Sequence, residues 1–71
     1  MDPEAFGEQL LQLRTDLGLS QSEAARRSGV EQGSWSRIEL GKTKAVSLNT
    51  AALALRGLGK TLTIVNDKEQ S

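Results

Sequence analysis

The side chains best suited to chemistry in this sequence are amides, hydroxyls and guanidinium groups in its middle third. Gln32, Ser34, Ser36 and Arg37 follow one another on what the spacing predicts to be the polar side of a short helix. A glutamine amide both donates and accepts hydrogen bonds, and an arginine presents a planar fork of donors. This set favours recognition of a polar surface through hydrogen bonds.

Catalysis is the least supported class of function. The 71 residues contain no His and no Cys, which excludes a disulfide framework and the usual zinc sites. No phosphate-cradling loop of the form G-x-x-x-x-G-K-[ST] is present, and the chain is too short to enclose a pocket. We therefore expect no catalytic residues, no metal and no cofactor.

Charge is distributed unevenly along a chain whose net formal charge is zero. Residues 1–25 carry five acidic side chains against one arginine, whereas residues 26–44 carry five basic side chains against two acidic ones. Zero net charge argues against a binder that depends on charge alone. With no signal peptide and no apolar run near the ~20 residues of a membrane span, we expect a soluble, cytoplasmic protein.

The first element that positions these residues is a predicted helix over residues 3–17. Asp2 caps its start, Pro3 suits the first helical position, and Gly18 ends it. Three- and four-residue steps predict one apolar stripe along this helix, made by Phe6, Leu10, Leu13 and Leu17.

The second predicted helix, over residues 21–28, has a well-marked start. Ser20 and Glu23 form a capping box, in which each side chain satisfies a free backbone N–H group. Ala25 is small enough for a neighbouring helix to approach closely, and Gly29 ends the helix.

Two further helices are predicted. One covers residues 32–40 and is stopped by Gly41, with Trp35 and Ile38 facing the core. The other begins after Ser47 and runs to about residue 58. Its predicted inner face consists of Leu48, Ala51, Ala52, Leu55 and Leu58.

The last organised stretch alternates β-branched and apolar residues and is predicted to be a strand. A single strand leaves its N–H and C=O groups unpaired, so we expect it to pair with the same strand of a second copy. The alternative is a loosely packed tail. We therefore expect the chain to consist of a domain over 1–60, a dimerisation strand over 61–66 and a flexible tail over 67–71. The strand residues are Thr61, Leu62, Thr63, Ile64 and Val65.

Two short helices joined by a tight turn form the most informative pattern in the chain. In a helix-turn-helix, the first helix lies across the DNA backbone and the second enters the major groove. Such a pair needs a small residue where the helices touch, a turn that tolerates positive φ, and apolar residues facing inward. The residues that meet these needs are, in order, Ala25, Gly29, Val30, Trp35 and Ile38. The sequence therefore predicts a helix-turn-helix over Ser20–Gly41, which makes the domain over 1–60 a helix-turn-helix DNA-binding domain.

The stretch LSQSEAARRSGVEQGSWSRIELGKT resembles the DNA-binding core of the Xre/Cro-type helix-turn-helix family. The resemblance implies a mainly α fold, a four- or five-helix lambda-repressor-like domain, with the C-terminal β-strand pairing across a dimer. The matching positions are Leu19, Ser20, Gln21, Ala25, Gly29, Val30, Ser36, Arg37, Ile38, Glu39 and Gly41.

Carried over by position, the resemblance also implies the contacts with double-stranded DNA. Gln21 would pack its amide against phosphate and against the reading helix. Glutamine can bond adenine N6 and N7, and arginine can bond guanine O6 and N7. The implied base-reading positions are Gln32, Gly33, Ser34, Ser36 and Arg37, and the implied phosphate contacts are Gln21, Arg26, Lys42 and Lys44.

Three residues depart from the family pattern. Glu31 stands where a neutral Ser or Thr cap is usual, and its charge would repel phosphate unless it points away. Gly33 removes a side chain that often touches bases, which either lets the backbone approach DNA or lowers specificity. Trp35 is larger than the usual aliphatic residue and is assigned to the core. Glu39 is typical of the family and is interpreted as a structural partner for a nearby arginine.

The resulting hypothesis is a homodimeric, sequence-specific repressor that binds a palindromic operator and regulates its own operon. The strand after the last helix resembles the HipB-like branch, which implies an antitoxin that binds a HipA-type kinase toxin. One alternative is a phage-type or restriction-control regulator. Another is a protein-interaction module that has lost DNA binding, which zero net charge, Glu31 and Gly33 favour.

Overall fold

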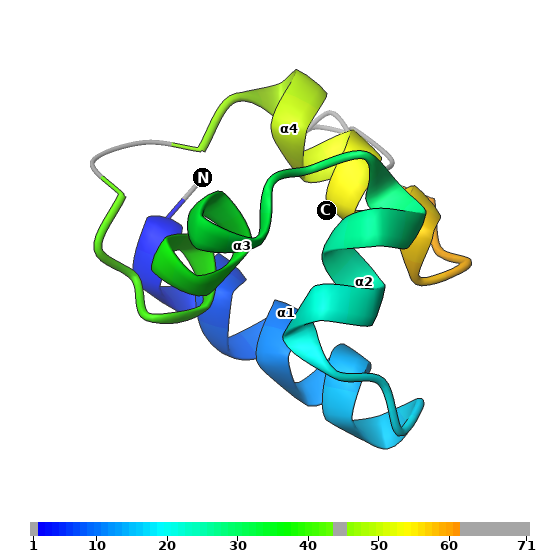
Figure 1. The fold of residues 1–71 in the computed structure, drawn as a ribbon. Coiled ribbons are helices and arrows are strands. Elements are labelled where there is room, and N and C mark those ends of the chain that lie inside the picture. Colours follow the sequence, from blue (N-terminus) through cyan, green and yellow to red (C-terminus); the bar gives the residue numbers. More distant parts are fainter. Residues whose placement is uncertain (1, 44–45, 62–71) are drawn as a thin grey trace, which may run out of the picture.

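A computed structural model of the chain describes residues 2–43 and 46–61. These residues form four helices, which are α1 (Pro3–Asp16), α2 (Gln21–Ser28), α3 (Gln32–Glu39) and α4 (Leu48–Gly57). Helix α1 packs on α3, and α2 packs on both α3 and α4. In the view of Figure 1, α1 runs below α3 and α2, while α4 lies above α2. The mainly α architecture is confirmed for this part of the chain.

Three of the four helices begin at a side-chain cap. The side chains of Asp2, Ser20 and Ser47 each accept a hydrogen bond from a backbone N–H two or three residues later, at 3.1 Å. These bonds satisfy N–H groups that have no partner inside the helix. In the predicted capping box, the Ser20 side chain accepts its hydrogen bond from the Glu23 N–H. The Glu23 carboxylate lies 3.8 Å from Arg27 on the same helix.

Three helices end one residue before their predicted limit. Leu17, Leu40 and Leu58 are the C-cap residues of α1, α3 and α4 rather than members of the helices. Gly18 follows the first of these caps with a φ of +72°, in the left-handed region that glycine favours. The predicted helix-stopping role of Gly18 is confirmed.

The core is centred on Trp35 and Leu10, both fully buried. Leu19 and Ala54 also belong to it, although neither was predicted as a core position. Leu13 and Leu55 are partly buried and pack against this cluster. The other core members are Phe6, Ala24, Ala25, Ile38, Ala51 and Leu58.

Two predicted core positions are wrong. Leu17 is 50% exposed and Leu48 is 54% exposed, and Leu40, whose place was open, is 63% exposed. Each stands at the first or last position of a helix or at its cap. A stripe predicted from helical spacing continues to the end of the helix, whereas burial at the end depends on which other elements pack there.

Two glycines allow close backbone contact between helices. A Cβ atom added to Gly7 in α1 would collide with the carbonyl oxygen of Ile38 in α3. A Cβ atom added to Gly57 in α4 would lie 2.6 Å from the Cβ of Ser28 in α2. The two helices of the helix-turn-helix are therefore each held against a neighbour at a position where a larger residue would not fit.

The predicted strand lies almost entirely outside the described residues. Thr61 is exposed and in coil, and Leu62 to Val65 fall beyond the part that the structure describes. Strand formation and pairing with a second copy therefore stay predictions. No helix among the described residues is long and apolar enough to cross a membrane.

Candidate nucleic-acid interface

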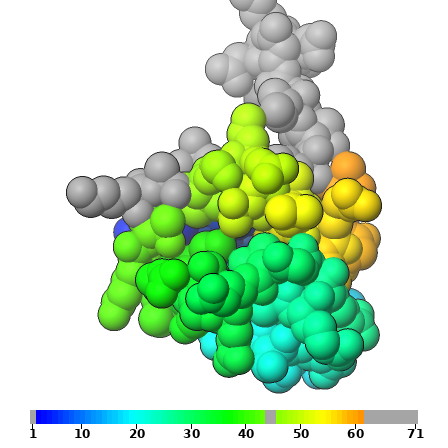
Figure 2. All heavy atoms as spheres, turned by 45° about the horizontal axis from the view of Figure 1, so that its top comes forward, coloured from blue at the N-terminus to red at the C-terminus, as the bar shows by residue number. Residues whose placement is uncertain are grey.

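Helix α3 presents a polar strip to the surface while its other side forms the core. Trp35 and Ile38 face inward, with 0% and 4% of their surface exposed. The predicted core role of both residues is confirmed. The five predicted base-reading positions divide into the exposed Gln32, Gly33 and Arg37 and the half-buried Ser34 and Ser36. Figure 2 shows α3 at the surface between α2 and the start of α4.

The turn between α2 and α3 has the predicted geometry. Gly29 adopts a left-handed conformation with a φ of +74°, and the next residue, Val30, donates its backbone N–H to the carbonyl of Ala25 at 3.1 Å. Val30 is partly buried and packs against the core. This local arrangement reverses the chain within three residues, so α3 is held across α2.

A buried carboxylate at the end of α3 joins three helices. Glu39 accepts hydrogen bonds from Arg14 Nε at 2.5 Å and Nη2 at 3.0 Å, so the pair is bidentate. Gln21 Nε2 donates to the same carboxylate at 2.9 Å, and Trp35 Nε1 donates at 2.6 Å. We call Arg14, Gln21, Trp35 and Glu39 the Glu39 network. It confirms the interpretation of Glu39 as the partner of an arginine.

The Glu39 network sets the ionisation of its members. Burial by itself would raise the pKa of Glu39, but the hydrogen bonds from Arg14, Gln21 and Trp35, together with the charge of Arg14, outweigh it and hold the pKa below its ordinary value. The bond to Glu39 likewise raises the pKa of Arg14, although burial opposes it. The carboxylate is therefore ionised at neutral pH and fully occupied in positioning α3.

Arg14 is the member of this network that sequence reasoning missed. It lies 25 positions before Glu39, on a helix otherwise rich in acidic residues. Its third nitrogen, Nη1, donates to the carbonyl of Leu19 at 2.8 Å and so also fixes the chain that leads into α2. The only signal in the sequence was that Arg14 is the single basic residue among residues 1–25.

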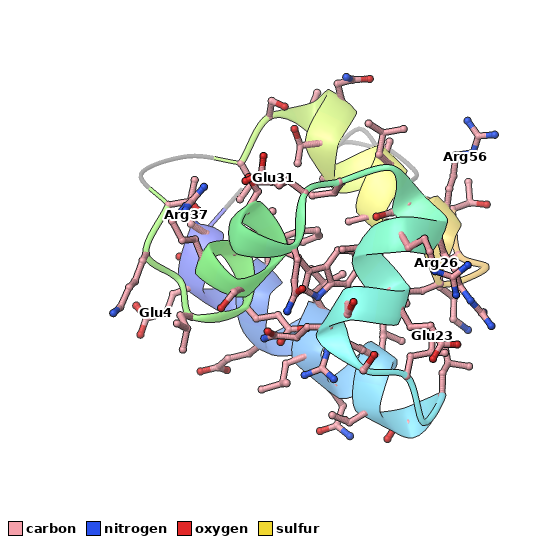
Figure 3. All side chains as sticks on the ribbon, in the orientation of Figure 1. Glu4, Glu23, Arg26, Glu31, Arg37 and Arg56 are labelled. Carbon is pink, nitrogen blue, oxygen red and sulfur yellow. The ribbon has the colours of Figure 1, made fainter. Side chains whose placement is uncertain are left out.

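The predicted phosphate contacts that the structure describes come from α2 and from the segment after α3. Gln21 contacts the reading helix as expected, through Glu39, and its contact with phosphate stays a prediction. Lys42 is exposed just after α3, and its backbone N–H donates to the carbonyl of Arg37 at 3.0 Å. Arg26 lies on the opposite side of the view from Arg37 (Figure 3). Lys44 falls outside the described residues.

A hollow of about 260 Å³ lies between α3 and the start of α4. It is lined by Arg37 and the hydroxyl-bearing residues Ser34, Thr43, Ser47 and Thr50, with Ile38 and Val46 as its apolar members. Arg37 Nη2 also donates to Ser34 Oγ at 3.2 Å. Guanidinium and hydroxyl groups both donate hydrogen bonds to anionic oxygens, so this surface suits a phosphate-bearing ligand. Within the described residues, no group of His, Cys, Asp and Glu could hold a metal ion.

Gly33 has no steric reason to be glycine. An added Cβ atom would lie 3.5 Å from Glu31 Oε1 and 3.7 Å from Arg37 Nη1, which are ordinary van der Waals contacts, and its φ is not positive. We expect Gly33→Ala to raise the free energy of unfolding by about 0.5–1 kcal/mol, because alanine is the better helix former. Urea denaturation would measure it. An unchanged or lower stability would contradict the expected gain from helix propensity at this position.

Comparisons with known proteins agree with this geometry. The profile of a family described as "Helix-turn-helix domain" matches residues 5–63. An uncharacterized HTH-type transcriptional regulator of Haemophilus influenzae is 43% identical over 61 residues, which are 86% of this chain and 61% of that protein. The crystal structure of the clp gene regulator ClgR from Corynebacterium glutamicum has a TM-score of 0.77 and 34% identity, covering 86% of this chain and 64% of that one. The chain thus spans less than two thirds of each of these two proteins.

The family match includes all of α2, α3 and α4 and all but the first two residues of α1. It therefore contains the whole helix-turn-helix and the α1 residues that hold it, Gly7 and Arg14. Assignment to the HipB-like branch stays a prediction. The chain belongs to the Xre-like helix-turn-helix family.

Proposed function

We propose that this chain binds DNA in a sequence-dependent manner through α3 and so regulates transcription. The observation that carries the proposal is the division of α3 into a core side, with Trp35 and Ile38 fully packed, and an exposed strip of groups that hydrogen-bond to bases. Gln32 suits adenine and Arg37 suits guanine. The relative named as an HTH-type transcriptional regulator and the structural neighbour named as a clp gene regulator support the same proposal.

The contacts that hold α3 against α1 and α2 support the proposal further. Direct readout requires that side chains be held in register with base edges, since a shift of about 1 Å already weakens hydrogen bonds. The Glu39 network and the close contact at Gly7 tie α3 to α1 and α2 at its C-terminal end. Gln32 and Arg37 would then meet the groove with little loss of conformational freedom.

Phosphate contacts would set the position of α3 in the groove. Lys42 lies shortly after the end of α3. The next residue, Thr43, lines the hollow beside Arg37. Such contacts add affinity without sequence information and make binding weaker at high salt. Lys44 belongs to the same proposed set. Arg26 is included in it only if the DNA backbone also reaches the far side of α2.

A dimer on a palindromic operator is the proposed assembly. Two reading helices one DNA turn apart, ~34 Å, would each occupy a half-site. Residues 61–65 are the proposed pairing strand, on the basis of their β-branched alternation alone. Sedimentation at micromolar concentration tests this, because a monomer that binds a single half-site would contradict it.

The finer roles follow from where such a dimer binds. A dimer on its own promoter would act as a repressor by excluding the polymerase. The antitoxin role rests on the resemblance of the C-terminal stretch to the HipB-like branch. Co-expression with a HipA-type kinase, followed by purification of one partner, tests this role, and failure of the two proteins to form a complex would contradict it.

Selection from a random duplex library, followed by affinity measurements at two salt concentrations, tests the proposed function directly. We expect one enriched palindromic sequence and an affinity that falls as salt rises. Arg37→Ala should weaken binding to the enriched sequence by about 1–3 kcal/mol. The matched control is Arg56→Ala, which removes the same charge from an exposed arginine that lies away from α3 (Figure 3).

The pair of variants separates base reading from general attraction. Equal losses for Arg37→Ala and Arg56→Ala would mean that charge alone governs binding. A library from which nothing is enriched would favour the alternative of a protein-interaction module, for which zero net charge and Glu31 are the supporting observations.

A further inference from the structure

Glu31 is the one helix cap of the described part whose side chain makes no capping hydrogen bond. Asp2, Ser20 and Ser47 each bond a backbone N–H group, whereas the Glu31 side chain makes no such bond at the start of α3. Its carbonyl still accepts the first helical bond, from the N–H of Trp35 at 2.9 Å. Glu31 is exposed, so its carboxylate is available to a ligand.

The Glu31 carboxylate reaches the same place on α3 as the Arg37 guanidinium. The position of a Cβ atom on Gly33 lies 3.5 Å from Glu31 Oε1 and 3.7 Å from Arg37 Nη1. Both charged groups therefore flank the bare backbone of an exposed glycine. Figure 3 shows Glu31 at the start of α3 and Arg37 farther along the same helix.

We propose that Glu31 is a specificity-determining residue, which accepts a hydrogen bond from the N4 amino group of cytosine beside the guanine read by Arg37. The inference rests on the proposed DNA binding by α3 and names part of the sequence it selects. The glycine between the two charged groups adds no side chain of its own to this surface.

The chemistry of a carboxylate selects cytosine among the four bases. An ionised carboxylate only accepts hydrogen bonds, and guanine and thymine present acceptors in the major groove. Adenine does present the N6 donor, but N7 and the O4 of its paired thymine are acceptors on either side of it. The N4 donor of cytosine has an acceptor on one side only, the O6 of its guanine. Cytosine is thus the base whose neighbouring acceptor atoms repel a bound carboxylate least.

Phosphate repulsion, the objection to a carboxylate in this position, is reduced by its surroundings. Glu31 stands at the N-terminus of α3, where the helix dipole presents partial positive charge. Arg37 supplies a full positive charge on the other side of Gly33. Within the described residues the two charges form no ion pair at 4.0 Å or less, so both retain hydrogen-bonding capacity for bases.

The test compares library selections with the unaltered chain, Glu31→Gln and Glu31→Ala. We expect the unaltered chain to select cytosine at one position beside a selected guanine. Glu31→Gln should select adenine at that position, because a glutamine amide pairs with adenine N6 and N7. Glu31→Ala should show no preference there, and every other position should stay unchanged.

The ratio of affinities for two duplexes cancels the effect that a change in net charge has on binding to any DNA. For each protein, binding is measured to two duplexes that differ only in carrying cytosine or adenine at that position. We expect the preference for cytosine to change by roughly tenfold or more toward adenine in Glu31→Gln. The matched control is Glu23→Gln on α2, where the carboxylate belongs to a side chain that is 43% exposed, and it should leave the ratio unchanged.

Each contrary result has a separate meaning. If the unaltered chain selects a sequence and both Glu31 variants select the same one, or tighten binding equally for all sequences, the role of Glu31 is wrong and DNA binding stands. If the unaltered chain enriches no sequence, the proposed function fails and the inference fails with it.

Discussion

Glu39→Gln is expected to lower the free energy of unfolding by about 3 kcal/mol, because it leaves a buried arginine without its counter-charge. The side chains of Arg14 and Glu39 are only 12% and 3% exposed, so water cannot replace the lost interaction. A domain of this size has a total stability on the order of 5 kcal/mol. The substitution should therefore leave the chain only marginally folded.

Urea denaturation followed by fluorescence of the single tryptophan would measure this loss. Trp35 is fully buried, so unfolding should change its emission strongly. The control is Glu23→Gln, which removes a carboxylate 3.8 Å from Arg27 on a side chain that is 43% exposed, and it should change stability by less than about 0.5 kcal/mol. Similar losses in both variants would mean that the Glu39 network adds nothing beyond an ordinary surface ion pair.

The same carboxylate predicts how stability depends on pH. The pKa of Glu39 is lower in the folded state than in the unfolded state. At a pH between these two pKa values, the folded chain therefore binds fewer protons than the unfolded chain. The contribution of Glu39 is therefore fully present above its ordinary pKa near 4.5 and is lost as pH falls through the lower folded value. The stability difference from Glu39→Gln should shrink on acidification and stay constant between pH 6 and 8.

Gly7→Ala is expected to lower the free energy of unfolding by about 2 kcal/mol, although alanine favours a helix by about 1 kcal/mol over glycine. The added Cβ atom would collide with the carbonyl oxygen of Ile38 and lie 3.0 Å from that of Glu39. Both are backbone atoms, so no side-chain rotation relieves the overlap. Helix α1 would have to move away from α3.

Gly33→Ala is also a glycine-to-alanine substitution in a helix, but it is expected to raise the free energy of unfolding rather than lower it. Both glycines lie inside helices, but Gly33 is exposed and Gly7 is buried. Urea midpoints of the two variants should move in opposite directions. We also expect Gly7→Ala to weaken specific DNA binding, since the backbone it displaces belongs to α3. A stabilising effect of Gly7→Ala would show that α1 and α3 are farther apart than the structure has them.

Sequence reasoning was most accurate where an element depends on its own neighbours in the chain. The caps at Asp2, Ser20 and Ser47 bond atoms only two or three residues away, and Gly29 turns the chain through its own φ. Such local preferences are properties of the residue types. Helix starts were therefore predicted to the residue, and the inward side of α3 was predicted from spacing alone.

Sequence reasoning was least accurate where burial depends on elements that are distant in the chain. Spacing placed Leu17 and Leu48 on inner faces, yet both are about half exposed in the described part of the chain. Gly7 carried no signal, since its role depends on where the carbonyl oxygens of α3 lie. Periodicity identifies a face of a helix but does not say how far its partner extends.

The helix-turn-helix itself shows the same division. The sequence alone determined that α2 and α3 exist and where each begins. It also determined that Gln32, Gly33 and Arg37 lie on the outer side of α3. Only the tertiary structure decided that Arg14 of α1 binds Glu39 of α3, that Gln21 joins them, and that Glu31 and Arg37 reach the same place over Gly33. Those contacts depend on how the helices pack, which no short stretch of sequence specifies.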